Sequence, residues 1–543
     1  MPVGRGPKAA RERGYEPRPQ APHSLRFKDR LEKRPSGERD RRYVTAEGTT
    51  VKTNCHAVTE LFTVTSRACL DLDHVALGHS VLWCFSLTKS PGDGTMQPNF
   101  LKYLERRVPR YTSYPTAVQF GPEVSAAGYA DWLADLPGGA PLSLYVHVPF
   151  CAELCFYCGC NTTVVRRYEP VAAYVKLLER EIAMVGAIVK SRGVGNMHWG
   201  GGTPTMLAVP DFTKVMEGLR AQFDFAPDAE LAIEIDPRTI TRDYTLALAQ
   251  LGINRASLGV QDFDEQVQRT VGRMQSAEQT AHVVDWFREA GVNGINLDLM
   301  YGLPFQTEAT LEQTIERALK LDADRIALFG YAHVPWMKKH QQLIPEQALP
   351  GTSERFAQSR LAADMLIGAG YEPVGLDHFA KSTDLLAQRR REARLHRNFQ
   401  GYTTDESEAL LGFGTSAIGS LPQGYVQNAA STVAYREAIS AGRLATVRGR
   451  ALTTEDRIRR DIITSLMCNL HVDLAEICAL HETSADRFAA ELANLDGFVR
   501  DGLVELAGSE ISLPEQARPF VRTVCAAFDQ YLTKDETRFS RAS

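Results

Sequence analysis

Four cysteines within ten residues constrain this chain more than any other feature of its sequence. Cys151, Cys155, Cys158 and Cys160 follow one another with the spacing C-x3-C-x2-C-x-C, directly after an apolar run at Leu142–Val148. This spacing differs from that of paired C-x2-C zinc sites and from that of ferredoxins. It fits a four-iron four-sulfur cluster that the first three cysteines ligate, with one iron left open for a substrate or cofactor.

The composition bounds the class of protein. The chain has 543 residues, 44% of them hydrophobic, which is enough for a large core and about two to four domains. A net charge of -5 and a pI near 6.3 give no reason to expect nucleic acid or a membrane surface as a partner. The sequence has no run of about 18 apolar residues, and its other cysteines are scattered. We therefore expect reduced thiols and a cytoplasmic protein.

Changes in composition divide the chain into four parts. Residues 1–95 begin with a basic stretch that cannot bury enough surface to fold, so we expect a disordered or non-native extension, with Met96 as the initiator. Residues 96–140 form a lid segment and residues 141–440 a catalytic domain. Residues 441–543 are expected to form a helical, winged-helix-like domain, which lacks the basic stripe of a DNA-binding module.

The catalytic part alternates short apolar runs with helical patterns, which is typical of βα units and a largely parallel sheet. Apolar spacing predicts a helix over residues 171–189, and Thr310 with Gln313 resembles a capping pair at another helix start. Glycine-rich stretches at 395–402 and 411–419 are expected to complete the sheet. The six predicted strands, enough for an open or partial barrel, are residues 142–148, 197–200, 231–235, 255–260, 294–299 and 325–329.

Polar residues and glycines follow several of these strands. The second strand runs into a glycine turn at residues 200–202, and Glu234, Gln261 and Asp298 lie at the ends of the next three strands. The carboxyl ends of parallel strands meet at one edge of a sheet, where chemistry gathers. A single carboxylate of this kind could equally be a satisfied structural group. Together above one sheet, beside four cysteines, these residues predict a ligand site.

The cysteine loop after the first strand and the glycine turn after the second resemble those of the radical S-adenosylmethionine superfamily. Residues 109–115 (PRYTSYP), residues 145–150 (YVHVPF), Cys160 and residues 301–304 (YGLP) further resemble the oxygen-independent coproporphyrinogen III oxidase family. The resemblance covers the chain from about Met96 to the C-terminus. It implies an α/β fold, a partial (β/α)6 barrel of the radical SAM type with a mostly helical C-terminal domain.

The resemblance also implies a set of cofactors. A four-iron four-sulfur cluster would be ligated by Cys151, Cys155 and Cys158, and two S-adenosylmethionine molecules would bind beside it. The residues implied for the first molecule are Tyr145, Gly201, Glu234 and Ile418. Those implied for the second are Tyr157, Gly202, Thr203, Gln261, Arg273, Asp298 and Ala332. The family commonly has Phe where this chain has Tyr157, and packing of the ring is preserved by that change.

The implied activity is the anaerobic oxidative decarboxylation of two propionates of coproporphyrinogen III to vinyl groups, by way of a 5′-deoxyadenosyl radical. The product, protoporphyrinogen IX, belongs to haem biosynthesis. The implied partners are this substrate and a low-potential electron donor such as flavodoxin or ferredoxin, and we expect a monomer. The candidate catalytic residues are Cys160, Arg110 and His333, although His333 could also be a buried structural histidine. The candidate cations for the propionates are Arg110, Arg273, Lys338 and Lys339.

Two other classes of protein share part of this pattern. A haem chaperone of the same superfamily would have the three-cysteine loop and the sheet, but it lacks the fourth cysteine and the RYTSYP segment, which both occur here. A zinc-binding structural protein needs neither the glycine turn nor the polar strand ends. The sequence therefore favours the oxidase over a binding protein. Cys160 could still be only a small buried residue beside the cluster.

Overall fold

The computed structural model of the protein describes residues 98–532. The expectations for residues 1–95 and for a start at Met96 therefore fall outside the described residues. Within residues 98–532, no helix is both long and apolar enough to cross a membrane.

Six parallel strands form the centre of the described chain. They pair in sequence order, and every one of them contains a strand predicted from the sequence, most with one to several further residues. The strands are β1 (Leu142–Val148), β4 (Gly193–Gly201), β5 (Asp224–Ile235), β6 (Arg255–Gln261), β7 (Gly294–Tyr301) and β8 (Arg325–Gly330). The prediction of a partial parallel barrel is thus confirmed.

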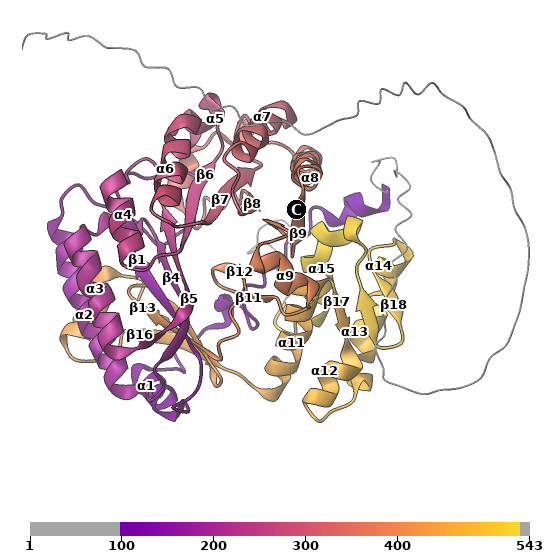
Figure 1. Ribbon diagram of the computed structural model, residues 1–543. Coiled ribbons are helices and arrows are strands. Elements are labelled where there is room, and N and C mark those ends of the chain that lie inside the picture. The colour runs from indigo at the N-terminus through magenta and orange to yellow at the C-terminus, as the bar shows by residue number, and fades with distance from the viewer. Residues whose placement is uncertain (1–97, 533–543) are drawn as a thin grey trace, which may run out of the picture. The chain divides into compact units, whose positions relative to one another are not determined.

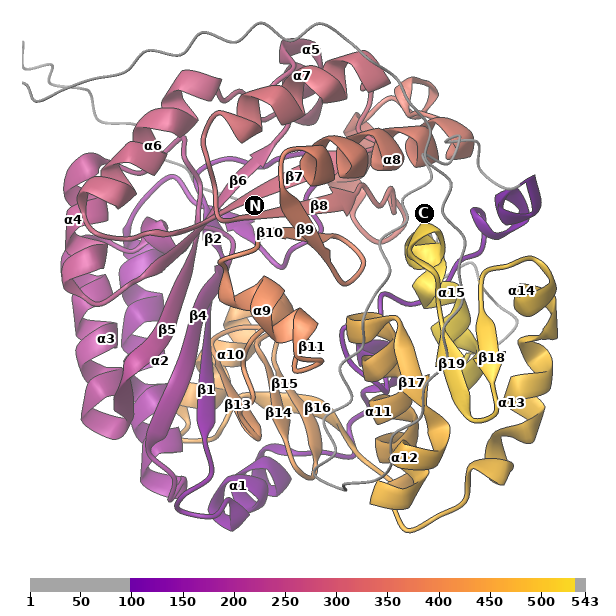
Figure 2. The ribbon, with the colours of Figure 1, turned by 45° about the vertical axis from the view of Figure 1, so that its right-hand side comes forward.

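Helices cover the outer face of these strands, as Figure 1 and Figure 2 show. The helices are α2 (Glu169–Ile188), α3 (Val209–Gln222), α4 (Arg242–Gln250), α6 (Ala277–Glu289), α7 (Glu308–Leu319) and α8 (Thr352–Gly368). The predicted helix over residues 171–189 is confirmed as α2. The predicted capping pair of Thr310 with Gln313 is wrong, because Thr307 caps α7 and exchanges hydrogen bonds of 3.2 and 2.9 Å with Thr310.

Further strands extend the sheet at both edges to twelve. On one edge β13 (Ala409–Phe413) pairs in parallel with β1, followed by antiparallel β14 (Ile418–Leu421), β15 (Gly424–Asn428) and β16 (Thr446–Ala451). On the other edge lie β10 (His378–Lys381) and β9 (Tyr371–Val374). The stretch at 411–419 therefore joins the sheet as predicted. The stretch at 395–402 does not, because β11 (His396–Asn398) and β12 (Gly401–Thr403) pair only with each other.

The C-terminal part is mainly helical and carries a small antiparallel sheet. Its main elements are α11 (Thr454–Asn469), β17 (His471–Asp473), α12 (Leu474–Leu480), α13 (Ala489–Asn494), β18 (Glu505–Ala507), β19 (Glu510–Ser512) and α15 (Val521–Cys525). Aromatic side chains of the segment before β1, including Tyr111 and Tyr114, pack into the same apolar cluster as these helices. The Tyr111 hydroxyl donates to Asp529 at 3.1 Å, and the Tyr114 hydroxyl accepts from the Gln530 amide at 3.0 Å. The segment predicted as a lid is thus fastened to the C-terminal part.

A buried carboxyl group fastens the turn between β13 and β14 to α2. Glu181 accepts hydrogen bonds of 2.7 Å from the Gly414 amide, the Tyr435 hydroxyl and the Asn428 side-chain amide. One helical heptad earlier, Tyr174 accepts from the Thr415 amide at 2.9 Å. Burial raises the pKa of Glu181 to about 7, although these three donors lower it. The turn that leads into β14 therefore has a fixed position relative to α2.

Replacing Glu181 by Gln should change how stability depends on pH. The pKa of this carboxyl rises from 4.5 to about 7 on folding, so the folded state binds the proton more tightly than the unfolded state. The protonated Glu181 carboxyl group therefore makes its full contribution to the free energy of unfolding at low pH. This contribution is lost as the pH rises through about 7, and the loss is at most about 3 kcal/mol. The Glu181→Gln variant lacks this loss. Its unfolding free energy relative to wild type should therefore increase between about pH 5 and about pH 8 in denaturant titrations.

The exposed Glu217→Gln change on α3 is the matched control for this measurement. Its difference from wild type is the baseline for removing an exposed carboxyl group, against which the result for Glu181→Gln is compared. If the difference for Glu181→Gln varied with pH no more than this baseline does, the carboxyl would not be held in the buried, hydrogen-bonded state described here.

Candidate active site

The cysteine loop lies at the carboxyl end of β1. Cys151 belongs to β2 (Phe150–Cys151), a short strand that pairs with β3 (Thr163–Val164). Backbone hydrogen bonds close the loop, since the Cys158 amide donates to the Cys155 carbonyl at 3.1 Å and the Phe156 amide donates to the Val271 carbonyl at 2.8 Å. The loop is therefore anchored both to itself and to the end of α5 (Glu265–Val271).

A pair of arginines faces the sulfur of Cys155. Arg273 Nη1 lies 3.5 Å and Arg238 Nη2 lies 3.6 Å from Cys155 Sγ. Asp236 holds both guanidinium groups, with distances of 2.7 Å to Arg238 and 3.4 Å to Arg273. Both guanidinium groups can donate hydrogen bonds to this sulfur when it ligates iron.

The other two predicted ligands also have hydrogen-bond donors directed at their sulfur atoms. Thr203 Oγ1 lies 3.8 Å from Cys151 Sγ, and the Cys160 amide donates to Cys158 Sγ at 3.4 Å. A Cβ atom at Gly202 would lie 2.5 Å from the Phe150 carbonyl and 3.0 Å from Cys151 Sγ, so this position admits only glycine. Among residues 98–532, no three ligand side chains converge on a single metal ion. Donors around three separated thiols fit a larger group that is ligated by three thiolates.

The predicted contacts of the first S-adenosylmethionine lie on neighbouring strands. Glu234 Oε2 accepts from the Gly201 amide at 3.1 Å, and a Cβ at Gly200 would lie within 3.1 Å of both Glu234 and Tyr145. The Tyr145 hydroxyl is 3.0 Å from His147 Nδ1, and His147 Nε2 donates to the Asn161 carbonyl at 3.1 Å. Burial lowers the pKa of His147, which favours the neutral ring. In that form Nδ1 accepts a hydrogen bond from the Tyr145 hydroxyl.

Ile418 begins β14, two strands from β1 in the sheet. Tyr145 in β1 pairs with Gly412 in β13, and a Cβ at Gly412 would lie 2.7 Å from the Ile418 carbonyl. Three of the four residues predicted for the first molecule therefore lie on the adjacent strands β1, β4 and β5, and β13 separates Ile418 from them.

Hydrogen bonds and close contacts connect several of the residues predicted for the second molecule. Gln341 links two of them, because its side-chain amide donates to the carbonyls of Tyr157 at 2.9 Å and Ala332 at 3.3 Å. Arg273 donates to the Gly259 carbonyl at 2.5 Å, and a Cβ at Gly259 would lie 3.1 Å from the Gln261 side-chain amide. Gly202 and Thr203 adjoin the same loop through Cys151. Their roles toward this molecule remain predictions.

Asp298 is the second carboxyl group among these candidates. It accepts from Ser257 at 3.0 Å and from Asn296 at 2.8 Å. Burial and the nearby charge of Glu234 raise the pKa of Asp298 to about 6. Glu234 lies near the end of β5 and Asp298 lies within β7, with β6 between them, and both carboxyl groups can accept hydrogen bonds from the hydroxyl or ammonium groups of a ligand.

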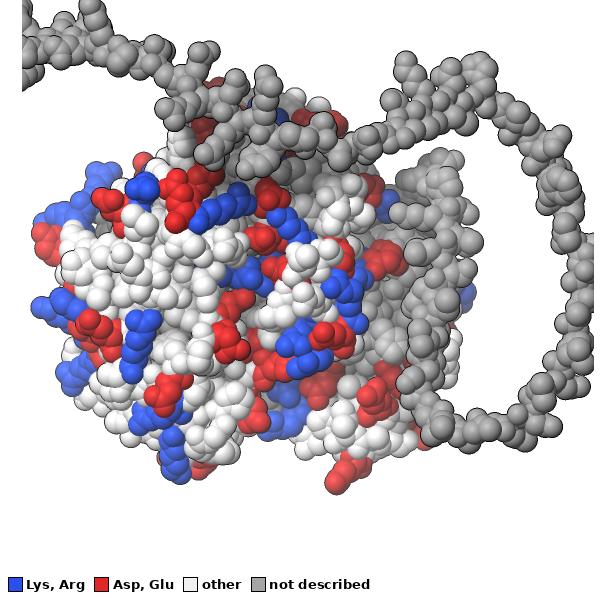
Figure 3. Space-filling model, viewed as in Figure 1, with Lys and Arg blue, Asp and Glu red and all other residues white. Residues whose placement is uncertain are grey.

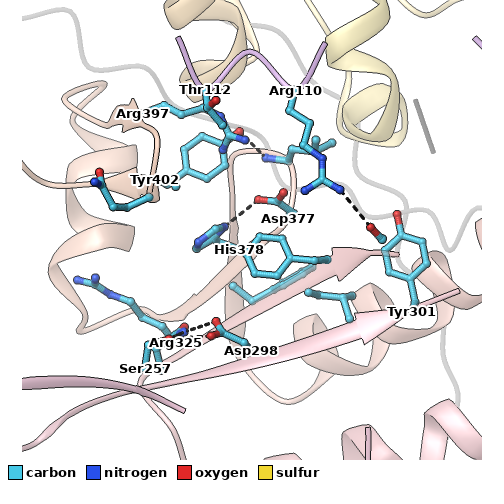
Figure 4. Close-up of a pocket in the computed structure, with 18 of the residues that line it drawn as sticks. Arg110, Thr112, Ser257, Asp298, Tyr301, Arg325, Asp377, His378, Arg397 and Tyr402 are labelled. Carbon is cyan, nitrogen blue, oxygen red and sulfur yellow. Dashed lines mark hydrogen bonds and ion pairs between the residues drawn. The ribbon is translucent and has the colours of Figure 1, made fainter. Parts of the chain in front are cut away.

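A cavity of about 1150 Å³ lies along these strands, with residues from their first to their last positions in its wall. Its wall includes six of the predicted site residues, and Figure 4 shows Arg110 and Asp298 on opposite sides of it. Arg273, Lys338 and Lys339, which were candidates for binding propionates, do not line it. The predicted residues in the wall are Arg110, Cys160, Glu234, Asp298, Ala332 and His333.

His333 is neither fully buried nor free of partners. Its Nδ1 lies 2.9 Å from the Tyr331 hydroxyl and its Nε2 lies 3.2 Å from Glu346. The ring thus has a fixed orientation at the cavity wall, which suits a proton donor as well as a structural residue.

Several residues of the site were missed in the sequence. Arg238 lies three residues after the end of β5, so the strand-end pattern that selected Glu234 would have found it if it had been extended by four residues. No sequence pattern of this kind indicates Gln341 or His147. Gln341 acts on backbone carbonyls through a long connection after β8, and His147 lies inside an apolar strand.

Comparisons with known proteins agree with this geometry. The model of the radical SAM superfamily matches residues 145–318, and that of the HemN C-terminal domain matches residues 452–520. The chain is 50% identical over 443 residues to the oxygen-independent coproporphyrinogen III oxidase of Bradyrhizobium diazoefficiens, covering 81% of this chain and 98% of that protein. The corresponding protein of Paracoccus denitrificans is 41% identical, with 79% and 96% covered.

A solved structure is similar over the same region. It is the coproporphyrinogen III oxidase (HemN) of Escherichia coli, a radical SAM enzyme, with a TM-score of 0.75 and 40% identity over 78% of this chain and 98% of that one. The thiol loop, the parallel sheet and near-complete coverage of these relatives agree with one another. The chain belongs to the oxygen-independent coproporphyrinogen III oxidase family of radical SAM enzymes.

Proposed function

We propose that this protein catalyses the oxygen-independent oxidative decarboxylation of two propionates of coproporphyrinogen III, which yields protoporphyrinogen IX for haem biosynthesis. The observation that carries the proposal is the cavity of about 1150 Å³, which has Cys160 of the thiol loop in its wall together with Glu234 and Asp298. Each conversion removes one hydrogen atom and one electron from the side chain, and the carboxylate leaves as carbon dioxide.

The chain offers a place for each cofactor of the family. Cys151, Cys155 and Cys158 would hold a four-iron four-sulfur cluster, because each sulfur already has a hydrogen-bond donor directed at it. One S-adenosylmethionine would contact the Tyr145–Glu234 side of the loop and a second would contact the other side. When bound, the cluster and S-adenosylmethionine supply the radical that abstracts hydrogen from the substrate.

The protein's own residues bind, orient and exclude water. Glu234 is oriented by the Gly201 amide, and Asp298 is oriented by Ser257 and Asn296. These fixed carboxyl groups can hold the hydroxyl or amino groups of a ligand without reorganising. The thiol loop is closed by backbone hydrogen bonds and is partly buried, which limits access of water to reactive groups.

Three further features are part of the proposal. A low-potential electron donor such as flavodoxin or ferredoxin would reduce the cluster, because the reaction starts with delivery of one electron. We propose a monomer that acts in the cytoplasm.

The alternative function, a carrier that binds and delivers haem, is not favoured. A carrier would have the same cysteine loop and sheet. However, the relatives that this chain matches over almost their full length are named as the oxidase. The fourth cysteine, Cys160, is exposed at the cavity wall, where a carrier would have no need of it.

Anaerobically reconstituted protein should convert coproporphyrinogen III to a divinyl product. The assay supplies S-adenosylmethionine and a chemical reductant, and it measures released carbon dioxide together with the porphyrin products after oxidation. We expect about two molecules of carbon dioxide per molecule of product, because two propionates are lost. Tight binding of haem without release of carbon dioxide would instead indicate the carrier.

Replacing Cys160 by Ser should leave the cluster in place. Cys160 contacts Cys158 Sγ through its backbone amide and through a side-chain hydrogen bond, and a serine keeps both donors. Iron content and the visible absorption of the reconstituted Cys160→Ser variant should therefore equal those of wild type. The Cys155→Ser variant is the matched comparison and should lose most of both. Loss of the cluster from Cys160→Ser would mean that the ligands have been assigned wrongly.

A further inference from the structure

The cavity wall carries charges of both signs. On the face shown in Figure 3, too, Lys and Arg are interspersed with Asp and Glu, so no broad patch of one sign appears there. The wall contains eight carboxyl groups and nine arginines, namely Arg107, Arg110, Arg255, Arg325, Arg355, Arg360, Arg397, Arg518 and Arg522. Which of these arginines can bind an anionic substrate therefore depends on how each of them is paired.

Some of these arginines are neutralised by the protein's own carboxylates. Arg255 and Arg325 pair with Asp384 at 3.5 and 2.8 Å, and they also share Glu230. Arg360 pairs with Asp364 at 3.7 Å. Because these carboxylates balance their charge, such arginines attract an anionic ligand only weakly.

A second group is different, because three arginines surround one carboxylate. Asp377 carries the negative charge, and Arg110, Arg397 and Arg522 carry the positive charges. Burial alone would raise the pKa of Asp377, but the hydrogen bond from His378, at 2.8 Å, and the surrounding cations lower it to about 2. Burial and the repulsion by Arg110 lower the pKa of Arg522 to about 10. The cluster therefore has an excess of positive charge at neutral pH.

Arg397 shows most directly what the cluster lacks. Its guanidinium group stacks on the Tyr402 ring at 4.3 Å, which fixes its plane. Its Nε and Nη1 atoms are buried, and they have no hydrogen-bond partner within residues 98–532. Buried donors of a charged group without acceptors are costly, and a carboxylate is the group that satisfies a guanidinium best. The site is thus built for a carboxylate ligand.

The three arginines come from three separate parts of the chain. Arg110 belongs to the PRYTSYP segment, Arg397 belongs to β11 and Arg522 belongs to α15. Arg110 Nη2 also donates to the Gly330 carbonyl at 3.5 Å. The cluster therefore forms only when the lid segment and the C-terminal helices pack together, as Tyr111 and Asp529 do at 3.1 Å.

The arginine cluster and the strands lie on different sides of the cavity. In Figure 4, Arg110, Arg397 and Asp377 lie on one side, whereas Asp298 and Ser257 lie on the other, on β7 and β6. Cys160 of the thiol loop is also in the wall, so a ligand that fills the cavity would contact both the arginines and this loop.

We propose that Arg110, Arg397 and Arg522 bind the carboxylates of the two propionates that the reaction retains, an inference that rests on the proposed function. A propionate that leaves as carbon dioxide must give up its negative charge. Pairing that group with arginines would stabilise the substrate more than the transition state and would slow the reaction. The retained propionates keep their charge throughout the reaction. Binding them therefore does not slow the decarboxylation, and it orients the edge of the substrate that carries the reacting propionates.

The test compares two porphyrins that differ only in the propionates at issue. Coproporphyrin III has both kinds, whereas protoporphyrin IX has only the retained pair. Binding to reconstituted full-length protein is followed by quenching of tryptophan fluorescence, since Trp336 lines the cavity. We expect Arg397→Met and Arg110→Met each to weaken binding of both porphyrins by a similar factor, roughly ten- to a hundredfold. Arg397→Lys should lose less, because it keeps the charge.

Arg360→Met is the matched control, since Arg360 also lines the cavity but is paired with Asp364, and it should leave both affinities unchanged. Iron content and melting temperature establish that each variant is folded. The inference is overturned if the variants weaken coproporphyrin III alone, which would place the reacting propionates at the cluster, or if they weaken neither. Conversion by the same wild-type preparation is assayed separately. If wild type converts no substrate, the proposed function fails, whatever the arginine variants do to affinity.

Discussion

The parallel pairing of β1 with both β4 and β13 is the interaction on which the rest of the structure depends. Because β1 lies between them, three loops that are far apart in the sequence end at one edge of the sheet. They are the thiol loop after β1, the glycine turn at residues 201–203 after β4, and the turn at 414–418 after β13. A shift of register at β1 by one residue would turn Tyr145 to the opposite face and separate it from Glu234.

The packing around this edge explains the unusual residues found there. Gly200, Gly202 and Gly412 each lie where a Cβ would meet a neighbouring side chain or carbonyl. Buried polar groups, above all Glu181, fix the turn after β13 from behind. The edge is therefore rigid before any cofactor binds, as a site for reactive chemistry requires.

The cavity joins two kinds of recognition. Carboxyl groups of β5 and β7 lie in its wall on the side of the barrel, and guanidinium groups from outside the barrel lie on the other side. This division gives the lid segment and the C-terminal helices a function, since they supply Arg110 and Arg522 to a site that the barrel alone would leave incomplete. The chain can be acidic overall and still bind an anion, because the cations are gathered in one buried place.

The sequence predicted those features of the structure that depend on residues close together in the chain. The six strands were predicted because each is a short apolar run, and the thiol loop because its ligands lie within eight residues of one another. The stretch at 395–402 was assigned to the main sheet wrongly, since glycine content says nothing about which strand is the partner. The grouping of Arg397 with Arg522 was not predictable, because it arises from the packing of two parts of the chain. Lys338 was chosen for its charge, but it donates to the Cys160 carbonyl at 2.9 Å instead of facing the cavity.

An anaerobic crystal structure of the reconstituted protein with coproporphyrin III bound would test the central claim most directly. The claim is that one cavity holds the tetrapyrrole between the thiol loop and the arginine cluster. The expected result is a macrocycle inside the cavity, with two propionates in contact with Arg110 and Arg397 and the opposite edge toward Cys160 and Asp298. A macrocycle bound on the outer surface, or one with its propionates turned away from the arginines, would contradict it.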